Sequence, residues 1–251
     1  MKNSIPLYQT YRQRLSQTEL FQNLPLEILD EMLAHFRFES WNKGSVHDSR
    51  IAMQRFYLVL EGRMQLTRIH PGTGKQITLS ILKEGDMYDV LTLLDGQYHD
   101  ISPSALDDLK LLSAPIDDVR QWIKKHPEFN DNFMPYLGKR MRDREALAAD
   151  LGLYDAHTRL ARLVLRYATG DAAQGNGDNG GIDVTLLHDL SNETLAHMVG
   201  SARQVVNRHL QAMKKDGILH MAHRHLIIDD LEKLKQEAEN LQLQLQTSDS
   251  T

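Results

Sequence analysis

The feature that most constrains this chain is a change in the spacing of its apolar residues near residue 115. From about residue 37 to that point, short apolar runs alternate with turn signals, such as Gly85 followed by Asp86. Residues 70–74, HPGTG, separate MQLTRI from KQITLSIL and predict a hairpin. Many short strands at roughly even spacing are typical of a β-roll or barrel. After residue 115 the apolar residues recur at helical spacing, so the sequence predicts an α+β fold.

Helices are expected on both sides of the strand-rich segment. Residues 15–36 predict two short helices, with Pro25 at the start of the second, where proline is tolerated. Residues 116–126 predict another short helix, and 128–153 predict a long one.

The long helix carries an apolar seam near heptad spacing. Its predicted members are Phe133, Leu137, Met141, Leu147 and Leu151. Such a seam can pair with the same helix of a second chain, or it can pack against the β-roll of its own chain. We expect pairing, which makes this segment a dimerisation helix.

Composition excludes several classes of protein. The 251 residues are 41% hydrophobic and 25% charged, which is enough apolar content to bury substantial cores. The absence of cysteine excludes disulfides, cysteine-ligated zinc and cysteine-ligated iron–sulfur clusters. No apolar run approaches the ~18 residues of a membrane span, and the N-terminus does not resemble a secretory signal. We therefore expect a cytoplasmic protein with no membrane partner.

The net charge of −5 means that any binding to nucleic acid must rest on a local surface. Residues 170–181, GDAAQGNGDNGG, predict a flexible linker ahead of the C-terminal segment. This stretch lacks the Gly-Lys-Ser/Thr ending of a phosphate-binding loop. Because no nucleophile–base pairing or HExxH-type spacing is found either, we expect no enzyme.

A helix-turn-helix is predicted after the linker, in DLSNETLAHMVGSARQVVNRHLQAMKKDGIL. Ser191 is placed to cap the first helix, and Gly200 ends it and permits a tight turn. Ser201 is expected to cap the second helix. The residues expected to pack inward from that helix are Val205, Val206, Leu210 and Met213.

The start of the second helix is polar, and it is this end of a recognition helix that enters the major groove. Arg203 and Arg208 can each donate two hydrogen bonds to guanine, and Gln204 can pair with adenine. We expect these three residues to read bases in double-stranded DNA.

Two short strands after Gly217 predict a wing. The predicted contacts to the DNA backbone, from the wing and from the recognition helix, are Ser201, Lys214, Lys215, His223 and Arg224. The wing histidines His220, His223 and His225 could instead bind a metal. With no carboxylate or cysteine near them in the sequence, and with their positions on alternate faces of a strand, we expect no metal site.

These motifs resemble the catabolite-activator (Crp/Fnr) superfamily of bacterial transcription regulators over residues 20–229. SNETLAHMVGSARQVVNRHLQAMKKDGIL resembles its helix-turn-helix, FYLVLEGRMQL and ILKEGD its β-roll, and LYDAHTRLARLVLRYA the helix after its dimerisation helix. The resemblance implies a homodimer on a palindromic operator, with RNA polymerase as a partner. It also places Arg203, Gln204 and Arg208 at the base-reading positions, where the family often has glutamate in place of Gln204.

The resemblance implies a cyclic-nucleotide-type roll, but the residues of the nucleotide grip are missing. Val90 stands where the family has a ribose-binding glutamate, and no arginine precedes Ser104 and Ala105. Asp89 and Asp100 would repel a phosphate. We therefore do not expect a cyclic nucleotide bound in the usual mode.

The effector remains open at this stage. A weak candidate pocket consists of Asp86, Tyr88, Asp89 and His99. No cofactor is certain; haem, with His126 and Met134 as candidate ligands, a small organic acid, or no effector are the alternatives.

The predicted organisation is a β-roll effector-type domain over 1–127, a dimerisation helix over 128–153, a winged helix-turn-helix over 154–229 and a helical extension over 230–251. The extension carries an apolar stripe too short for a stable coiled coil, so we expect it to dock on the protein or a partner. The predicted function is sequence-specific transcription regulation. The alternative is a ligand-sensing module that acts through a protein partner.

Overall fold

The computed structural model describes residues 5–48, 50, 54–169, 173–176, 181–223 and 225–239. The chain divides into two compact units, one built mainly from residues up to 145 and the other mainly from residue 146 onward. No helix in the described ranges has the length and apolarity that a bilayer crossing needs.

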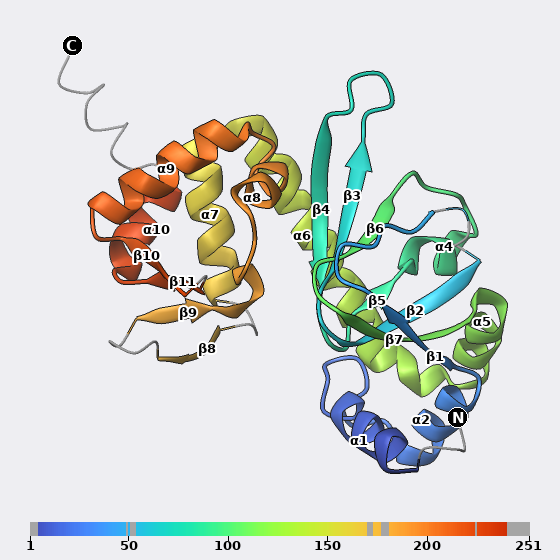
Figure 1. Ribbon diagram of the computed structural model, residues 1–251. Helices are drawn as coiled ribbons and strands as arrows, with labels where there is room; N and C mark the ends of the chain where they lie inside the picture. The colour runs from blue at the N-terminus through green and yellow to red at the C-terminus, as the bar shows by residue number, and fades with distance from the viewer. Residues whose placement is uncertain are drawn as a thin grey trace. The chain divides into compact units, whose positions relative to one another are not determined.

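The first unit contains the predicted β-roll, built from two antiparallel sheets (Figure 1). One sheet has the order β1-β7-β2-β5, with β1 at Arg37–Trp41, β2 at Arg55–Glu61, β5 at Met87–Tyr88 and β7 at Leu109–Pro115. The other has the order β4-β3-β6, with β3 at Met64–Ile69, β4 at Gln76–Leu82 and β6 at Ser102–Ala105. The expected hairpin at residues 70–74 joins β3 and β4 and is confirmed.

Strand β2 is central because its apolar run serves two cores. Phe56, Leu58 and Leu60 join one buried cluster, whereas Tyr57 and Val59 join the other. Successive side chains of a strand point to opposite faces, so a continuous apolar run is stable only where both faces are covered. β2 pairs with β7 in a register that sets Leu58 opposite Leu112.

Helices of the first unit are α1 (Ile5–Leu15), α2 (Leu26–Ala34), α4 (Val90–Asp95), α5 (Ile116–Lys125) and a 3-10 turn at Pro127–Phe129. The first helix therefore precedes the segment from residue 15 where it was predicted. The hydroxyl of Ser16 donates to the carbonyl of Gln13, and that of Thr18 to the carbonyl of Leu15, so side chains satisfy the last carbonyls where the helix stops. Leu20 and Phe21 are buried, but they lie in turns.

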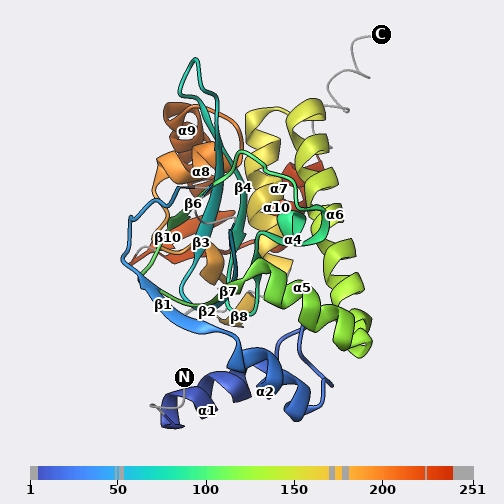
Figure 2. The same cartoon turned by 90° about the vertical axis from the view of Figure 1, so that its right-hand side faces the viewer.

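The predicted long helix is confirmed as α6, Asn130–Leu153, a single helix that follows the turn after α5 (Figure 2). Pro135 is the sixth residue of this helix, beyond the first four residues whose amides are unpaired in any helix, so it removes one backbone hydrogen bond near the start of α6.

The second unit packs α7 (Ala156–Thr169), α8 (Asn192–Met198), α9 (Arg203–Lys215) and α10 (Leu231–Glu239) with a sheet of order β10-β11-β9-β8 (Figure 1). The strands are β8 at Ala173–Asn176, β9 at Ile182–Val184, β10 at Leu219–Ala222 and β11 at His225–Ile228, and a 3-10 turn spans Thr185–Leu187. The expected docking of the extension holds for residues 231–239, because α10 packs on α7 and buries Leu234 and Ala238. Residues 240–251 lie outside the described part.

The sequence predicted a flexible linker over residues 170–181, but part of this segment is a β-strand. Residues 173–176 form β8, which pairs antiparallel with β9 and sets Asn176 opposite Ile182. Backbone pairing needs no particular side chain, so composition alone does not reveal a strand that adds to an existing edge.

Candidate nucleic-acid interface

The helix-turn-helix begins with the predicted cap. Ser191 Oγ accepts a hydrogen bond from the amide of Thr194 at 3.0 Å, which satisfies one of the free donors of α8. The turn closes through the amide of Ser201, which donates to the carbonyl of Ala196 at 2.9 Å.

Gly200 lies in the left-handed region, with φ of +61°. A Cβ at this position would stand 2.7 Å from Leu151 Cδ2 at the end of α6. Both backbone conformation and close approach therefore favour glycine in this turn.

The second helix, α9, begins one residue later than predicted. Its N-cap is Ala202, which is extended and makes no side-chain cap, so the prediction that Ser201 caps this helix is wrong. The reason is that Ser201 belongs to the turn, where its amide bonds back to α8. Of the residues expected to face inward, Val206, Leu210 and Met213 are buried and Val205 is half-buried.

The opposite face of α9 is polar and open to solvent. Arg203, Gln204 and Arg208 are all exposed there, with Gln204 and Arg208 one turn apart. Asn207 Oδ1 accepts a hydrogen bond from Asn192 Nδ2 at 2.9 Å, so this amide ties α9 to α8. Lys214 and Lys215 are exposed in the last turn.

The wing consists of β10 and β11, paired antiparallel from Leu219 with Ile228 to Ala222 with His225. His223 is exposed in its turn with φ of +48°. The predicted backbone contact Arg224 lies outside the described residues.

Carboxylates do approach the wing histidines, contrary to the premise of the sequence argument. His220 Nδ1 lies 2.9 Å from Asp229 Oδ1, and His225 Nδ1 lies 3.1 Å from Asp183 Oδ2. Asp183 belongs to β9, which pairs with β11 and so brings a distant carboxylate alongside.

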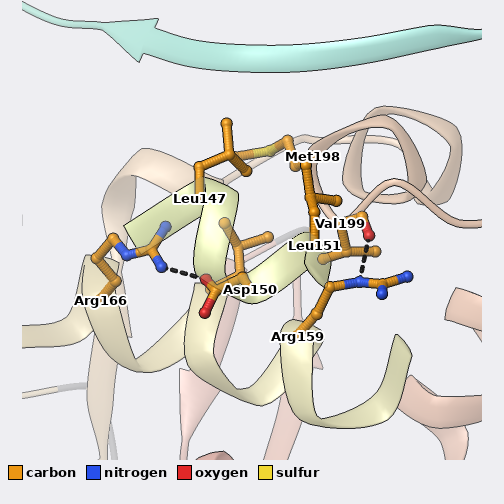
Figure 3. Close-up of a pocket in the computed structure, with 8 residues that line it drawn as sticks. Leu147, Asp150, Leu151, Arg159, Arg166, Met198 and Val199 are labelled. Carbon is orange, nitrogen blue, oxygen red and sulfur yellow. Dashed lines mark hydrogen bonds and ion pairs between the residues drawn. The ribbon is translucent and has the colours of Figure 1, made fainter. Parts of the chain in front are cut away.

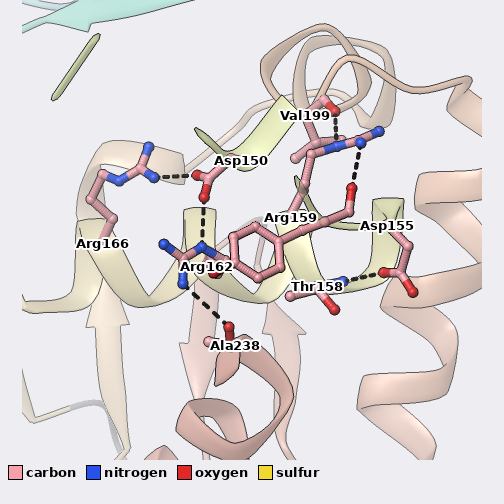
Figure 4. Close-up of polar contacts among 9 residues, drawn as sticks. Asp150, Asp155, Thr158, Arg159, Arg162, Arg166, Val199 and Ala238 are labelled. Carbon is pink, nitrogen blue, oxygen red and sulfur yellow. Dashed lines mark hydrogen bonds and ion pairs between the residues drawn. The ribbon is translucent and has the colours of Figure 1, made fainter. Parts of the chain in front are cut away.

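Three arginines on α7, Arg159, Arg162 and Arg166, bind neighbouring elements of the second unit and were not among the residues predicted from the sequence. Arg159 donates from Nε to the carbonyl of Val199 at 2.7 Å and from a guanidinium nitrogen to the carbonyl of Tyr154 at 2.8 Å (Figure 4). Arg159 thereby supplies hydrogen-bond donors to backbone carbonyls at the ends of both α8 and α6. The signal that could have found these residues is their i, i+3, i+7 spacing on one helix face.

Arg162 and Arg166 converge on one carboxylate. Asp150, near the end of α6, is buried and accepts from Arg162 Nε at 2.5 Å and from Arg166 (Figure 4). Arg162 also donates to the carbonyl of Ala238 at 3.4 Å, which joins α10 to the same group. Asp155 caps α7, since its carboxylate accepts from the amide of Thr158 at 2.8 Å.

A shallow pocket lies beside this group, between the end of α6, α7 and the helix-turn-helix (Figure 3). Its lining residues are Leu147, Asp150, Leu151, Arg159, Leu163, Arg166, Met198 and Val199. Two predicted members of the α6 seam, Leu147 and Leu151, therefore belong to the second unit and line a pocket within it.

The remaining seam residues differ in exposure. Met141 is 67% exposed and Leu137 is half-buried, whereas Phe133 is 2% exposed and packs against Phe129 in the core of the first unit. The side chain of Phe133 therefore has no surface to offer a second chain.

Two of the weak effector candidates pair with each other. His99 Nε2 lies 2.5 Å from Asp89 Oδ1, and Asp89 also caps α4 by accepting from the amide of Thr92. Asp89 is buried and has a left-handed backbone. Tyr88 beside it is fully buried, and burial followed by the nearby Asp89 charge raises the pKa of its phenol.

Asp86, the fourth candidate, forms an ion pair with a residue of α6. Its carboxylate pairs with Arg140 and also accepts from the amide of Lys83 at 2.9 Å. Burial lowers the pKa of the Arg140 guanidinium, but the nearby negative charge of Asp86 raises it by more. The pKa of Arg140 is therefore raised above its ordinary value. Burial, and then the Asp86 charge, raises the pKa of Tyr136 to about 12, and its hydroxyl accepts from the amide of Met87. This cluster joins the roll to the long helix.

The two haem candidates sit in different settings. His126 packs on Trp122 with its ring nitrogens 3.3 Å from a Glu31 oxygen and 3.5 Å from a Glu128 oxygen. Met134 is exposed on α6.

Comparison with known proteins gives matches along most of the chain. Residues 48–126 match the cyclic nucleotide-binding domain family, and residues 158–237 match the Crp-like helix-turn-helix domain family. The global nitrogen regulator of Nostoc sp. is 30% identical over 167 residues, covering 64% of this chain and 71% of that protein. The CRP-like cAMP-activated global transcriptional regulator of Mycobacterium tuberculosis is 28% identical over 184 residues, covering 73% and 80%.

The fold comparison agrees. A CooA variant from Carboxydothermus hydrogenoformans superposes with a TM-score of 0.71 at 27% identity, covering 90% of this chain and 99% of that one. The two sequence relatives are both named as regulators. With a nucleotide-binding-type roll, a long helix and a helix-turn-helix in the same order, this chain is a DNA-binding transcription regulator that belongs to the Crp/Fnr superfamily.

Proposed function

We propose that the chain acts in the cytoplasm as a homodimer on a palindromic operator. Two copies of α9 then enter successive major grooves, about 34 Å apart. The observation that carries this proposal is the exposed polar start of α9, which follows a tight turn after α8.

Base reading falls to Arg203, Gln204 and Arg208. Arginine suits guanine O6 and N7, and glutamine suits adenine N6 and N7, so Gln204 favours adenine at its base pair. Their exposure leaves all three able to reach a base edge.

Backbone contacts are assigned to Ser201, Lys214, Lys215 and His223, together with Arg224 outside the described residues. The segment 191–225 supports this with five Lys or Arg against two Asp or Glu, although the whole chain carries −5. A locally basic surface on an acidic protein directs the DNA to this unit.

The dimer face is assigned to α6. Leu137, Met141 and Leu151 follow heptad spacing, and the same spacing adds the exposed Met134 in place of the buried Phe133. Leu147 is a less favoured member because it falls off the heptad positions that Met134, Leu137, Met141 and Leu151 share. The predicted boundaries at 127/128, 153/154 and 229/230 are retained as the proposed domain organisation.

The effector is proposed to be something other than a cyclic nucleotide in the usual family mode. Val90 and Pro103 stand where an acidic and a basic ligand are needed, and Asp89 adds a buried carboxylate beside His99. The candidate pocket at Asp86, Tyr88, Asp89 and His99 contains two buried carboxylates, which disfavour a phosphate diester. Bound effector would shift the pose of α6 through Asp86 and Arg140, with RNA polymerase as the downstream partner.

Selection of DNA from a random duplex pool by the purified chain tests this function. The expected product is an inverted repeat with half-site centres about 10 base pairs apart. Repeating the selection with added cyclic AMP should leave the enriched site and its recovery unchanged. A pool that stays random at physiological salt would contradict operator recognition, and a site without symmetry would contradict the dimer.

A further inference from the structure

Two histidines and an aspartate meet beside the wing, where β9 pairs with β11. Asp183 lies on β9, His188 directly follows the 3-10 turn after β9, and His225 is the first residue of β11. Residues 42 positions apart come together because β9 and β11 are paired strands.

The geometry gathers one potential ligand atom from each residue. These three atoms all lie within 4.8 Å of one another. Asp183 Oδ1 contacts His188 Nε2, and Asp183 Oδ2 lies 3.1 Å from His225 Nδ1. A metal bound at about 2.0–2.2 Å from nitrogen and oxygen ligands holds them roughly 3–4 Å apart, so small side-chain rotations suffice.

The two imidazole rings also lie close together, with centroids 3.9 Å apart and planes tilted by 39°. A neutral imidazole carries the lone pair that a metal needs, and metal affinity accordingly competes with protons. The side chains of Asp183 and His188 are 19% and 16% exposed and that of His225 is 48% exposed, which leaves an entry path from solvent.

The donor set selects the class of ion. Two imidazole nitrogens and one carboxylate oxygen suit zinc and neighbouring divalent transition metals, whereas magnesium and calcium prefer oxygen ligands throughout. Three protein ligands leave at least one further position, which water can fill.

We propose that Asp183, His188 and His225 form a binding site for one divalent transition-metal ion of the zinc class. The ion joins β9, the segment after it and β11, and therefore fixes the wing one residue after Arg224. The site does not depend on which bases α9 reads.

The test is a calorimetric titration of the untagged full chain, stripped with a chelator, with zinc chloride in the absence of DNA. We expect one saturable zinc ion per chain, little heat with magnesium, and a rise in thermal midpoint with zinc. Asp183→Asn and His225→Gln should each weaken zinc binding by at least about tenfold, because each removes one ligand. His220→Gln is the matched control, since His220 is a wing histidine with a single carboxylate partner, Asp229. It should bind zinc like the wild type.

Equal zinc affinity in His225→Gln and the wild type would overturn the site, and so would the absence of saturable binding to the wild type. In the latter case the three residues are ion pairs only. If Asp183→Asn melts early without metal, His225→Gln decides alone, because its half-exposed side chain can be replaced without opening a core. Since no DNA is present, failure of operator recognition leaves this result unchanged.

Discussion

Asp150 Oδ1 accepts a hydrogen bond from Arg162 Nε at 2.5 Å, so a buried carboxylate of the long helix is held by the first helix of the DNA-binding unit. Arg166 takes its other oxygen (Figure 4). A carboxylate that accepts from two guanidinium groups has its direction fixed as well as its charge balanced. These contacts therefore tie the end of α6 to α7.

Asp150→Asn should destabilise the second unit by about 2 kcal/mol. Removing one partner of a buried pair costs ~3–5 kcal/mol, but the arginines are 29% exposed and water can solvate them in part. Denaturant unfolding measures the change. Glu232→Gln, which breaks the exposed pair with Lys235, is the control and should cost less than about 0.5 kcal/mol. Equal effects of the two variants would show that the buried group contributes no special stability.

Arg203→Ala should weaken binding to the selected operator by about 1–3 kcal/mol and leave binding to scrambled DNA nearly unchanged. Lys215→Ala should weaken both by a similar factor and reduce the slope of log affinity against log salt by about 0.9. Fluorescence anisotropy over a salt series measures both. If Arg203→Ala discriminates the two DNAs as well as the wild type does, Arg203 reads no base.

Met141→Glu should convert the proposed dimer to a monomer, because it places a charge in the centre of the α6 seam. Leu153→Glu is matched to it: Leu153 is 76% exposed on the same helix but lies off the heptad positions of the seam. Sedimentation velocity should therefore show a dimer for Leu153→Glu. Dimers for both variants would move the interface elsewhere.

Stability of the second unit should fall as the pH drops below neutrality, in part through His209. Burial, and then the charges of His157 and Arg208, lower the pKa of His209, with Asp155 acting in the opposite direction. The unfolded chain, with a histidine pKa of about 6.5, then binds more protons than the folded chain. This contribution is fully present above about pH 6.5 and is lost as the pH falls from there through the folded-state pKa.

Urea unfolding between about pH 7.5 and pH 5 tests this, with His209→Gln flattening the dependence. His35→Gln, at an exposed position in the other unit, should leave the slope unchanged. An unaltered slope in His209→Gln would assign the dependence to other groups.

The strand-rich roll and the helix-turn-helix could be predicted because their signals are local. Gly200 is an example, since a tight turn needs a residue that tolerates positive φ. Helix α1 could not, because its anchoring contacts are distant in sequence: Tyr8 donates to Asp30 at 2.8 Å and Arg12 pairs with the same carboxylate.

Face assignments on a long helix depend on tertiary packing in the same way. The heptad pattern alone does not distinguish Phe133 from Met134, and the core formed with Phe129 decides between them. The Arg159 and Arg162 contacts were missed because their acceptors include backbone carbonyls, which no sequence pattern displays.

Helix α10 has a practical consequence for anyone who isolates the DNA-binding unit. Leu234 and Ala238 are buried against α7, and the carbonyl of Ala238 receives Arg162. A fragment that ends after the wing would lack α10, so the apolar surface of α7 that α10 covers would be exposed to water. Arg162 would also lose the carbonyl of Ala238 as a hydrogen-bond acceptor. Autonomous folding of this unit thus calls for a C-terminal boundary at Glu239 or later.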